Sequence, residues 1–288
     1  MKNFENKVAL ITGAGHGFGF EFAKEAHKRG MKLFLTDIDE KALTERADEI
    51  KEAGGIVESL VMDVSLEADI KRMVDKCLEA YGQIDLLINN AGIAIGGAVT
   101  DIPTRDWEWI IGVNVMSQIF AMKYIIPIME KQGTDCHILN VASLAGLLTL
   151  GKMPAYFGTK HFSVALSESV SYDLQASGSN VKISVFCPGF VQTDLFNYEN
   201  HRPERFREQT DPYYSSNAYQ QILKMAKHVI ETGTPLKPVG PFVFKHLERD
   251  KFYIQLHKKP KLLIYKRMRN IIRENNPDYN AIKKYMGS

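Results

Sequence analysis

Short apolar runs alternate with amphipathic stretches over the first two thirds of the chain. The apolar runs are continuous, which indicates strands buried on both faces, as in a parallel sheet covered by helices. The expected strands are 7–12, 31–37, 55–64, 84–92, 136–143 and 181–189. The stretches between them have helical character. The predicted helices are 21–30, 39–55, 70–82, about 103–131 and 153–177.

This alternation predicts an α/β fold of the Rossmann-type, doubly wound kind, because right-handed crossovers place helices on both faces of a parallel sheet. A barrel is the structural alternative, and the glycine placement described below favours the open sheet. The sequence shows no repeat or flexible linker, so we expect a single domain over residues 1–288. A less regular section is expected from about 190 to 250, followed by a seventh strand at 251–257.

Composition and charge argue against a nucleic-acid-binding, disulfide-rich, secreted or membrane-spanning protein. The chain has 288 residues, 45% of them hydrophobic, and a net charge of +2, which implies no dominant attraction to nucleic acid. The three cysteines, Cys77, Cys136 and Cys187, are far apart, so we expect neither a disulfide framework nor a metal site, and read the two in strands as core residues. The N-terminus lacks the pattern of a signal peptide, and no apolar run approaches the roughly 18 residues of a spanning helix. These features predict a cytoplasmic protein.

The C-terminal tail, 245–288, differs in charge from the rest of the chain, with twelve Lys/Arg against four Asp/Glu. Four apolar residues in it follow helical spacing, opposite lysines and arginines: Ile264, Met268, Ile271 and Ile272. Such a helix could rest on an anionic membrane surface. The favoured interpretation is that it docks on its own domain or on a neighbouring subunit.

A glycine-rich turn, TGAGHGFG, follows the first predicted strand and opens the first helix. Gly13, Gly17 and Gly19 permit a tight turn and a close approach of the backbone to a phosphate, and the helix N-terminus offers free N–H groups to an anion. This context predicts dinucleotide binding.

Two acidic residues end the next two strands. Asp37 could accept hydrogen bonds from ribose hydroxyls and repel a 2′-phosphate, and since neither Ile38 nor His16 supplies a firm positive charge, we expect NAD as the cofactor, with NADP as the alternative. Asp63 could accept a hydrogen bond from the adenine amino group. Either carboxylate could instead cap the following helix.

Further motifs lie in order along the chain: NNAG at 89–92, Asn114 in GVNVMSQ, the spacing Ser-x12-Tyr-x3-Lys, and PGFVQT at 188–193. With the glycine turn, they resemble the short-chain dehydrogenase/reductase (SDR) family, in its compact single-domain branch, over roughly residues 5–195. The resemblance implies a seven-stranded sheet in the order 3-2-1-4-5-6-7 and a homodimer or homotetramer formed through the helices at 103–131 and 153–177. It implies that the cofactor contacts Gly13, Gly15, His16, Gly17, Phe18, Gly19, Asp37, Asp63, Val64, Asn90, Ala91, Gly92, Tyr156, Lys160, Pro188, Gly189, Val191 and Thr193.

Within this resemblance Asn114, Ser143, Tyr156 and Lys160 form the catalytic group. Tyr156 would exchange a proton with the substrate oxygen while hydride moves, and Ser143 would position that oxygen. Bringing a phenol from a pKa of about 10 to about 7 takes about 4 kcal/mol of selective phenolate stabilisation. One cation at about 4 Å and an effective dielectric of about 20 supplies that order of energy, so we expect Lys160, one helical turn away, to lower the pKa of Tyr156. The implied role of Asn114 is to bend its helix and hold a water that relays protons.

The substrate side is predicted from two segments. Residues 144–153 are almost wholly apolar, and the loop after Gly189 is rich in Phe and Tyr, so we expect a lid at about 190–230 over a large apolar pocket. A bulky hydrophobic secondary alcohol, such as a hydroxysteroid, fits best, while sugars, polyols and acyl-thioester ketones stay open. The arginines of this loop, Arg202, Arg205 and Arg207, could meet an anionic group, but solvated loop charges are favoured.

The remaining aromatic and histidine residues receive structural interpretations: His161 as a packing residue, and Trp107 and Trp109 as part of a subunit face. The bulky Phe18 and Phe20 are expected to alter packing around the glycine turn. A non-catalytic dinucleotide-sensing protein is the alternative class, disfavoured because both Tyr156 and Lys160 are present. A sugar-nucleotide epimerase is disfavoured because its loop more often reads TGxxGxxG.

Overall fold

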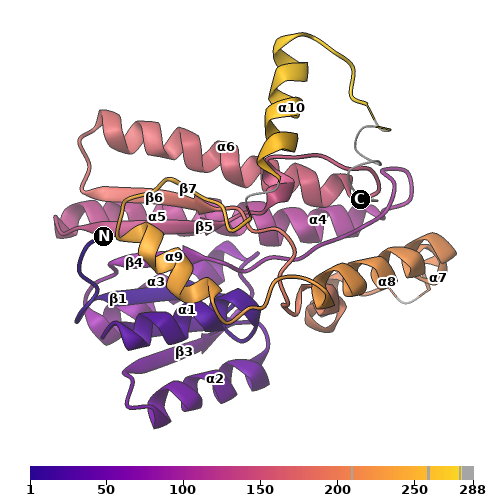
Figure 1. Cartoon of the computed structure of the whole chain (residues 1–288). Helices are drawn as coiled ribbons and strands as arrows, with labels where there is room; N and C mark the ends of the chain where they lie inside the picture. Colours follow the sequence, from indigo (N-terminus) through magenta and orange to yellow (C-terminus); the bar gives the residue numbers. More distant parts are fainter. Residues whose placement is uncertain (209, 258–259, 279, 281–288) are drawn as a thin grey trace.

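The computed structural model describes residues 1–208, 210–257, 260–278 and 280. Seven parallel strands form one sheet in the order β3-β2-β1-β4-β5-β6-β7, which confirms the predicted topology (Figure 1). The strands are β1 (Val8–Thr12), β2 (Lys32–Asp37), β3 (Val57–Val61), β4 (Leu86–Asn89), β5 (Cys136–Val141), β6 (Val181–Phe186) and β7 (Tyr253–Ile254). The strand order reverses between β1 and β4, so the carboxyl ends of these two strands diverge and open a crevice there.

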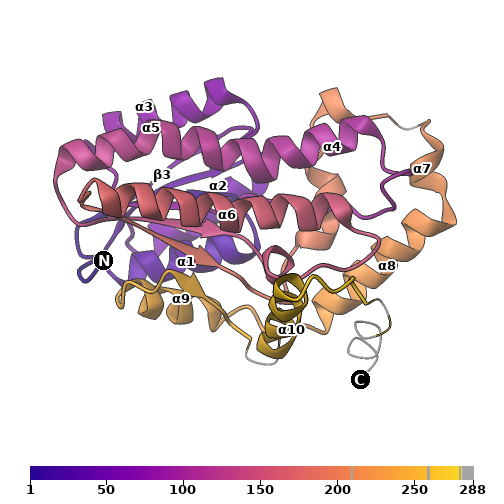
Figure 2. The ribbon, with the colours of Figure 1, turned by 90° about the horizontal axis from the view of Figure 1, so that it is seen from above.

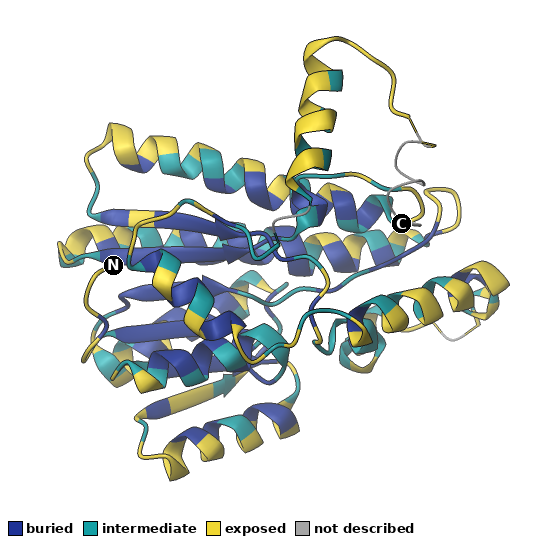
Figure 3. Cartoon of the chain, viewed as in Figure 1, coloured by how far each residue is buried: buried dark blue, intermediate teal, exposed yellow. Residues whose placement is uncertain are grey.

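Helices cover both faces of the sheet. The helices α1 (Gly17–Lys28), α2 (Glu40–Glu52) and α9 (Val239–Leu247) cover one face, and a hydrophobic cluster lies beneath them. The other face carries α3 (Glu67–Tyr81), α5 (Ser117–Gln132) and α6 (Pro154–Ala176) over a second cluster (Figure 2). The central strands are buried on both sides, as their continuous apolar sequences indicate (Figure 3).

The helix expected at about 103–131 is one continuous element with an irregular centre. It consists of α4 (Thr104–Ile111), a π-helical turn (Gly112–Met116) and α5. Within the described ranges, this helix is the one that is long and apolar enough to cross a membrane, and 56% of its most apolar window is buried inside the protein. That degree of burial is typical of the core helix of a globular domain.

The section from about 190 to 250 is more regular than the sequence analysis expected. It holds two short 3₁₀ segments, η3 (Leu195–His201) and η4 (Glu204–Phe206), then α7 (Pro212–Ser215), α8 (Asn217–Glu231) and α9. Ser216 caps α8, since its hydroxyl accepts a hydrogen bond from the backbone N–H of Tyr219. The expectation of an irregular section was therefore wrong for α8 and α9.

The C-terminal part holds a short strand and a projecting helix. The seventh strand is limited to β7, at the edge of the sheet beside β6, and is shorter than the predicted 251–257. The helix α10 (Lys261–Ile272) extends away from the body of the molecule, and none of its residues is buried (Figures 1 and 3). The expected docking of this helix on its own domain is therefore limited to its base, where Leu263 lines the cavity. Residues 258–259, 279 and 281–288 of the predicted basic tail lie outside the described residues.

Candidate active site

The glycine turn lies between the end of β1 and the start of α1. Gly13 and Gly17 have φ values of +64° and +49°, a region that glycine adopts readily. A Cβ on Gly19 would lie 2.0 Å from the carbonyl oxygen of Gly13, so the turn closes only with glycine there. The helix begins without a side-chain cap at His16, and its first N–H groups therefore remain available to an anion. This cradle fits a pyrophosphate.

The side chain of Asn90 holds the glycine turn in place through two hydrogen bonds. Its amide nitrogen Nδ2 donates to the carbonyl oxygens of Thr12 and Gly13, each at 2.9 Å. The Thr12 hydroxyl in turn accepts from the backbone N–H groups of Asn90 and Ala91. Since both Asn90 donors are used inside the protein, this side chain shapes the site, while Asn90, Ala91 and Gly92 also line the cavity.

Asp37 lies at the end of β2 with its carboxylate turned toward the glycine turn. Oδ2 accepts from the backbone N–H of Gly15 at 2.8 Å, and Oδ1 accepts from the backbone N–H of Asp39 at 3.0 Å. The N-cap of α2 is Asp39, which accepts from Ala42. The alternative in which Asp37 caps this helix is therefore wrong, and Asp37 remains part of the cavity wall.

Asp63 is held by neighbours on two segments. Oδ1 accepts from the backbone N–H and the hydroxyl of Ser65, and Oδ2 accepts from Arg205 at 2.7 Å. The N-cap of α3 is Leu66, so Asp63 does not cap that helix. Together with the neighbouring Val64, Asp63 lines the cavity. Arg205 belongs to η4, so the lid reaches across to the third strand.

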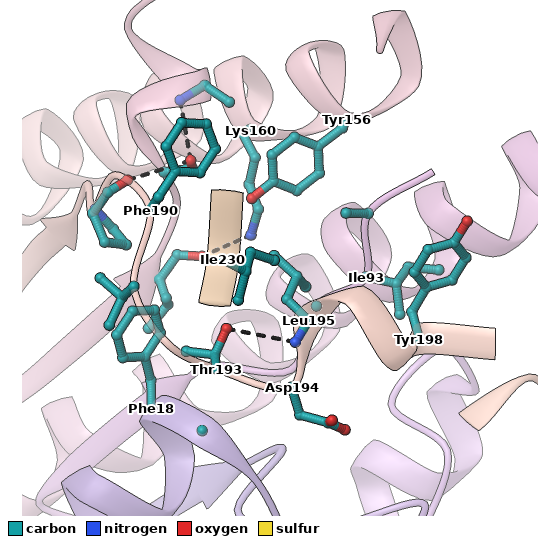
Figure 4. A pocket seen from close by; sticks show the side chains of 18 of the residues that line it. Phe18, Ile93, Tyr156, Lys160, Phe190, Thr193, Asp194, Leu195, Tyr198 and Ile230 are labelled. Atoms are coloured by element: carbon teal, nitrogen blue, oxygen red, sulfur yellow. Dashed lines mark hydrogen bonds between the residues drawn. The ribbon is translucent and has the colours of Figure 1, made fainter. Parts of the chain in front are cut away.

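Tyr156 and Lys160 lie on one face of α6, and their side chains turn into the same cavity (Figure 4). The Lys160 ammonium is 5.8 Å from the centre of the Tyr156 ring and donates to the carbonyl oxygen of Val141 at 3.0 Å. Ser143 follows β5; its hydroxyl accepts from the backbone N–H of Ala145 and contacts the carbonyl oxygen of Pro188. Two elements, α6 and the end of β5, thus bring the Ser–Tyr–Lys group together.

Burial dominates the electrostatics of this group. It raises the pKa of Tyr156, and the hydrogen bond with Ser143 opposes that shift without reversing it. Burial also lowers the pKa of Lys160 to about 8. Desolvation is thus the largest influence on the Tyr156 pKa, and Lys160 is not among the groups that shift it. The predicted lowering of the Tyr156 pKa is therefore not found in the chain alone, and for the site with its cofactor bound it stays a prediction.

Asn114 lies in the π-helical turn and is fully buried. Its Oδ1 accepts from the backbone N–H of Ile93, and its Nδ2 donates to the carbonyl oxygen of Ile93 and to the hydroxyl of Thr159. The asparagine thus ties the irregular part of the helix to the segment after β4. A Cβ on Gly92 would lie 3.4 Å from both Asn114 Oδ1 and Lys160 Nζ, which shows how near these two groups approach the same backbone position.

The loop after β6 folds back over the glycine turn. Val191 is buried and pairs with Thr234 in an isolated parallel bridge. The side chain of Thr193 lies where a Cβ on Gly17 would approach it to 3.3 Å. His257, which sequence reasoning missed, supports this loop: its Nδ1 accepts from the backbone N–H of Gly189, and its Nε2 contacts the Thr234 hydroxyl. No local pattern singles out this histidine, because its partners come from distant segments.

The cavity has a volume of about 1000 Å³ and a mostly apolar wall. The two segments expected to line it do so: 144–153 contributes residues such as Leu148 and Met153, and the lid contributes Leu195 and Tyr198. Within the expected lid, α8 adds Ala226, Val229 and Ile230 to the wall, and the structure adds two residues at the base of α10 that sequence analysis did not assign, Pro260 and Leu263. The Ser216 cap and the amphipathic pattern after it were the signals that could have identified α8.

The lid is anchored by an arginine that the sequence analysis took for a solvated charge. Arg202 is 6% exposed, and its guanidinium binds the buried carboxylate of Asp106 at 2.8 and 3.2 Å. It also lies over the ring of Trp109, 4.2 Å from the ring centre. Trp109 is 1% exposed and lines the cavity, so its assignment to a subunit face was wrong. Because the Arg202–Asp106 pair is buried beneath the lid, Arg202 is shielded from solvent, and Trp109, which packs against it, does not reach the surface.

The other residues with structural interpretations behave as packing groups. Phe18 packs against Phe22 and Phe186, while Phe20 lies under Lys24. His161 contacts the carbonyl oxygen of Phe157 within its own helix. All three cysteines are buried and free, with no disulfide between them.

A glycine cradle at the crevice of a doubly wound sheet, with Ser, Tyr and Lys in the adjoining cavity, is the arrangement of a Rossmann-fold oxidoreductase. The sequence matches the family model described as short chain dehydrogenase over residues 7–204, and the chain belongs to this family.

Two similar proteins cover nearly the whole chain. A CLA biosynthesis dehydrogenase/reductase from Lactiplantibacillus plantarum is 47% identical over 286 residues, which is 99% of this chain and all of that protein. The crystal structure of an SDR from Burkholderia phymatum in complex with NAD has a TM-score of 0.93 and 36% sequence identity, covering 96% of this chain and 98% of that one. Both extend beyond the family match into α8, α9 and α10.

Proposed function

We propose that the protein is an NAD-dependent oxidoreductase that interconverts a secondary alcohol and a ketone on a bulky, apolar substrate. The observation that carries this proposal is that Ser143, Tyr156 and Lys160 open into the same apolar cavity as the glycine turn. A proton donor, a hydroxyl that positions the substrate and a cradle for the cofactor phosphates thereby share one cavity, where a cofactor and a substrate can bind side by side.

The chain's residues fit a nicotinamide dinucleotide, which when bound supplies the hydride donor or acceptor. The N–H groups at the start of α1 would hold its pyrophosphate, because this cradle carries no side chain that would block the approach. Asp37 and Asp63 would lie at the adenosine end, and Val191 and Thr193 at the carboxamide end. Lys160 Nζ would donate to the nicotinamide ribose.

In this reaction Tyr156 Oη moves the proton. It accepts the hydroxyl proton of an alcohol during oxidation and returns it to the ketone oxygen during reduction, while Ser143 Oγ holds that oxygen in place. Burial raises the pKa of Tyr156 and so disfavours the phenolate. The attraction between the phenolate and the Lys160 ammonium opposes this, and it is strongest when water is excluded from the cavity. Asn114 would hold the water that connects Lys160 to solvent.

The preference for NAD rests on the end of β2. Asp37 places a carboxylate in the cavity wall, and in the part of the chain that the structure describes no Lys or Arg forms an ion pair with it. A 2′-phosphate beside this carboxylate would meet a like charge without a compensating cation. The NAD complex of the 36% identical relative gives further support.

The substrate proposal rests on the cavity wall and on one relative. Apolar residues from 144–153, the lid and α8 leave few polar groups to bind a sugar or polyol. We therefore propose a long or bulky apolar alcohol or ketone, either a hydroxysteroid or a hydroxylated lipid chain. The described role of the 47% identical relative, CLA biosynthesis, extends to this chain as part of the same proposal. A cytoplasmic location stays a prediction.

A panel of alcohols and ketones tests the proposal, with NAD⁺/NADH and NADP⁺/NADPH, followed by absorbance of the reduced nicotinamide. Hydroxysteroids, long-chain hydroxylated lipids, polyols and acyl-thioester ketones form its four groups. We expect turnover with one of the first two groups and a higher kcat/KM with the NAD pair. Faster turnover of polyols would contradict the substrate class. Tight NADH binding without turnover on any group would indicate a dinucleotide-sensing protein.

A further inference from the structure

Two histidines and two aspartates meet where the lid crosses the glycine turn. We call His16, Asp39, Asp194 and His201 the His–Asp cluster. His16 belongs to the glycine turn, Asp39 caps α2, Asp194 precedes the first 3₁₀ segment of the lid, and His201 ends that segment. The four side chains are between 20% and 35% exposed, so solutes can reach them.

Each imidazole lies between the same two carboxylates. Asp39 Oδ2 is 3.0 Å from His16 Nε2 and 3.8 Å from His201 Nδ1. On the other side, Asp194 Oδ2 is 3.2 Å from His201 Nε2 and 3.8 Å from His16 Nδ1. Two rings whose centres are 5.0 Å apart thus present one nitrogen to each carboxylate.

This arrangement lacks a cation. A neutral imidazole has one N–H and one lone pair, so when each ring donates to one carboxylate, its lone pair faces the other. Within the described ranges, Asp39 and Asp194 have ion-pair partners only in these two histidines, and no Lys or Arg joins them. Four groups rich in lone pairs therefore converge without a fixed positive charge.

We propose that the His–Asp cluster binds a divalent transition-metal ion. His16 Nε2, Asp39 Oδ2 and His201 Nδ1 all lie within 4.8 Å of one another and are the ligands. Zinc binds imidazole nitrogen and carboxylate oxygen at about 2.0–2.2 Å, so two ligand atoms on a tetrahedral ion lie about 3.3–3.6 Å apart. The observed 3.0 and 3.8 Å from Asp39 Oδ2 bracket that range, and the two imidazole nitrogens lie within 4.8 Å of each other, so a movement of the lid toward the glycine turn would complete the triangle.

Asp194 has a different role in this site. With both metal-facing nitrogens deprotonated, the opposite nitrogen of each ring carries the proton and points to Asp194 Oδ2. A carboxylate that accepts from the far side of ligating imidazoles fixes their tautomer and orientation. The remaining oxygen of Asp194 accepts from Asn197 Nδ2, which holds the carboxylate in place. The cluster therefore has both a ligand set and the support that such a set needs.

The ligand types favour zinc-like ions over magnesium or calcium. Imidazole nitrogens suit Zn, Co, Ni or Cu, whereas Mg and Ca require mostly oxygen ligands. Three protein ligands leave a fourth position for water or another donor. Because the ligands come from the glycine turn, α2 and the lid, a bound ion would fasten the lid over the cofactor crevice.

Metal binding by the purified full-length chain, stripped with a chelator, tests this proposal without any measurement of activity. We expect Co²⁺ to give the visible absorption of a low-coordinate site and Zn²⁺ to displace it, with one ion bound per chain in calorimetry. His16→Ala and His201→Ala should each remove this binding. His228→Ala is the matched control, because His228 lines the same cavity, is exposed, and lies outside the cluster; it should bind as the unaltered chain does.

Two further variants separate loss of the site from loss of the fold. Asp39→Asn retains a side-chain acceptor for Ala42 and should abolish metal binding while α2 stays capped. Asp194→Asn should weaken binding about ten- to a hundredfold, as changes in the groups behind metal ligands do. Unchanged circular dichroism of each variant shows that the fold is intact. The absence of a Co²⁺ spectrum and of Zn²⁺ binding in the unaltered chain, or binding that survives both alanine substitutions, would overturn the proposal.

Discussion

At the scale of single residues, the electrostatics of Tyr156 and Lys160 decide what the site can do. Burial raises the pKa of Tyr156, so the phenol stays neutral in the protein alone, and lowers that of Lys160 to about 8, which leaves the lysine mostly charged near neutral pH. A negative charge that forms on the phenol is then stabilised chiefly by the lysine, in surroundings of low polarity. Since Lys160 is also proposed to donate to the nicotinamide ribose, we expect the proton-transfer step and cofactor binding to be separable by substitution at Tyr156 but not at Lys160.

The substitution Tyr156→Phe tests this separation. It removes the proton-transferring oxygen and keeps the ring, so turnover should fall at least a thousandfold, within the range of about 10²–10⁴ that general acid–base groups contribute. The dissociation constant for NADH, measured by nucleotide fluorescence, should change little. Tyr172→Phe, on the exposed part of the same helix, is the matched control and should leave both unchanged. If Tyr156→Phe instead abolishes NADH binding, the role assigned to this hydroxyl is wrong.

Asp37→Ala addresses cofactor choice. It removes the negative charge beside the expected position of the 2′-phosphate, and we expect the ratio of kcat/KM for NADP to that for NAD to rise at least tenfold, which corresponds to about 1.4 kcal/mol. Because Gly15 loses a hydrogen-bond acceptor in this variant, some activity with NAD should also be lost. Asp135→Ala, a partly exposed aspartate before β5, is the control. An unchanged ratio would mean that another residue sets the preference.

At the scale of elements, the lid is held by contacts that cross between segments. Arg202 joins it to Asp106 of α4, and Arg205 joins it to Asp63 after β3. Asp106 is fully buried and also accepts from the hydroxyl of Tyr214 in α7. A single carboxylate of α4 thereby connects both parts of the lid to the body of the protein.

Arg202→Met measures how much this anchor contributes. The variant keeps an apolar side chain of similar length over Trp109 but leaves a buried carboxylate without its cation, which costs about 3–5 kcal/mol. Denaturant unfolding should show this loss in the free energy of unfolding. Arg207→Met, at a position whose side chain is 48% exposed, should change it by less than about 0.5 kcal/mol. Equal effects of the two substitutions would show that the buried pair has no special role.

At the scale of the whole molecule, two exposed surfaces are predicted to bind partners. The first is formed by α4, α5 and α6, through which a dimer or tetramer is predicted, and it exposes Phe162 and Tyr172. The second is the projecting helix α10, which exposes large apolar side chains: Leu262, Tyr265, Met268, Ile271 and Ile272. Since α10 packs little against its own domain, a neighbouring subunit is the partner that we favour for it.

The double substitution of Ile271→Asp and Ile272→Asp tests whether the partner of α10 is a second subunit or a membrane. If α10 docks on a second copy, the mass measured by light scattering should fall in this variant, and the unaltered chain should stay in the soluble fraction when vesicles containing anionic lipid are floated. Ile56→Asp, at an exposed position before β3, is the control for added charge. Flotation of the unaltered chain with such vesicles, lost in the double variant, would instead establish a membrane contact.

The sequence by itself determined the sheet, the glycine turn and the spacing of Tyr156 and Lys160. These features are local: a continuous apolar run specifies a buried strand, the close approach at Gly19 excludes any Cβ, and four residues along a helix bring two side chains to one face. Only the tertiary structure decided the rest. The partners Asp106 and Arg202 are 96 positions apart, and the His–Asp cluster joins three separate segments, so their pairing depends on the path of the chain. The direction of the Tyr156 pKa shift likewise depends on how deeply the fold buries the phenol, which the spacing of residues does not contain.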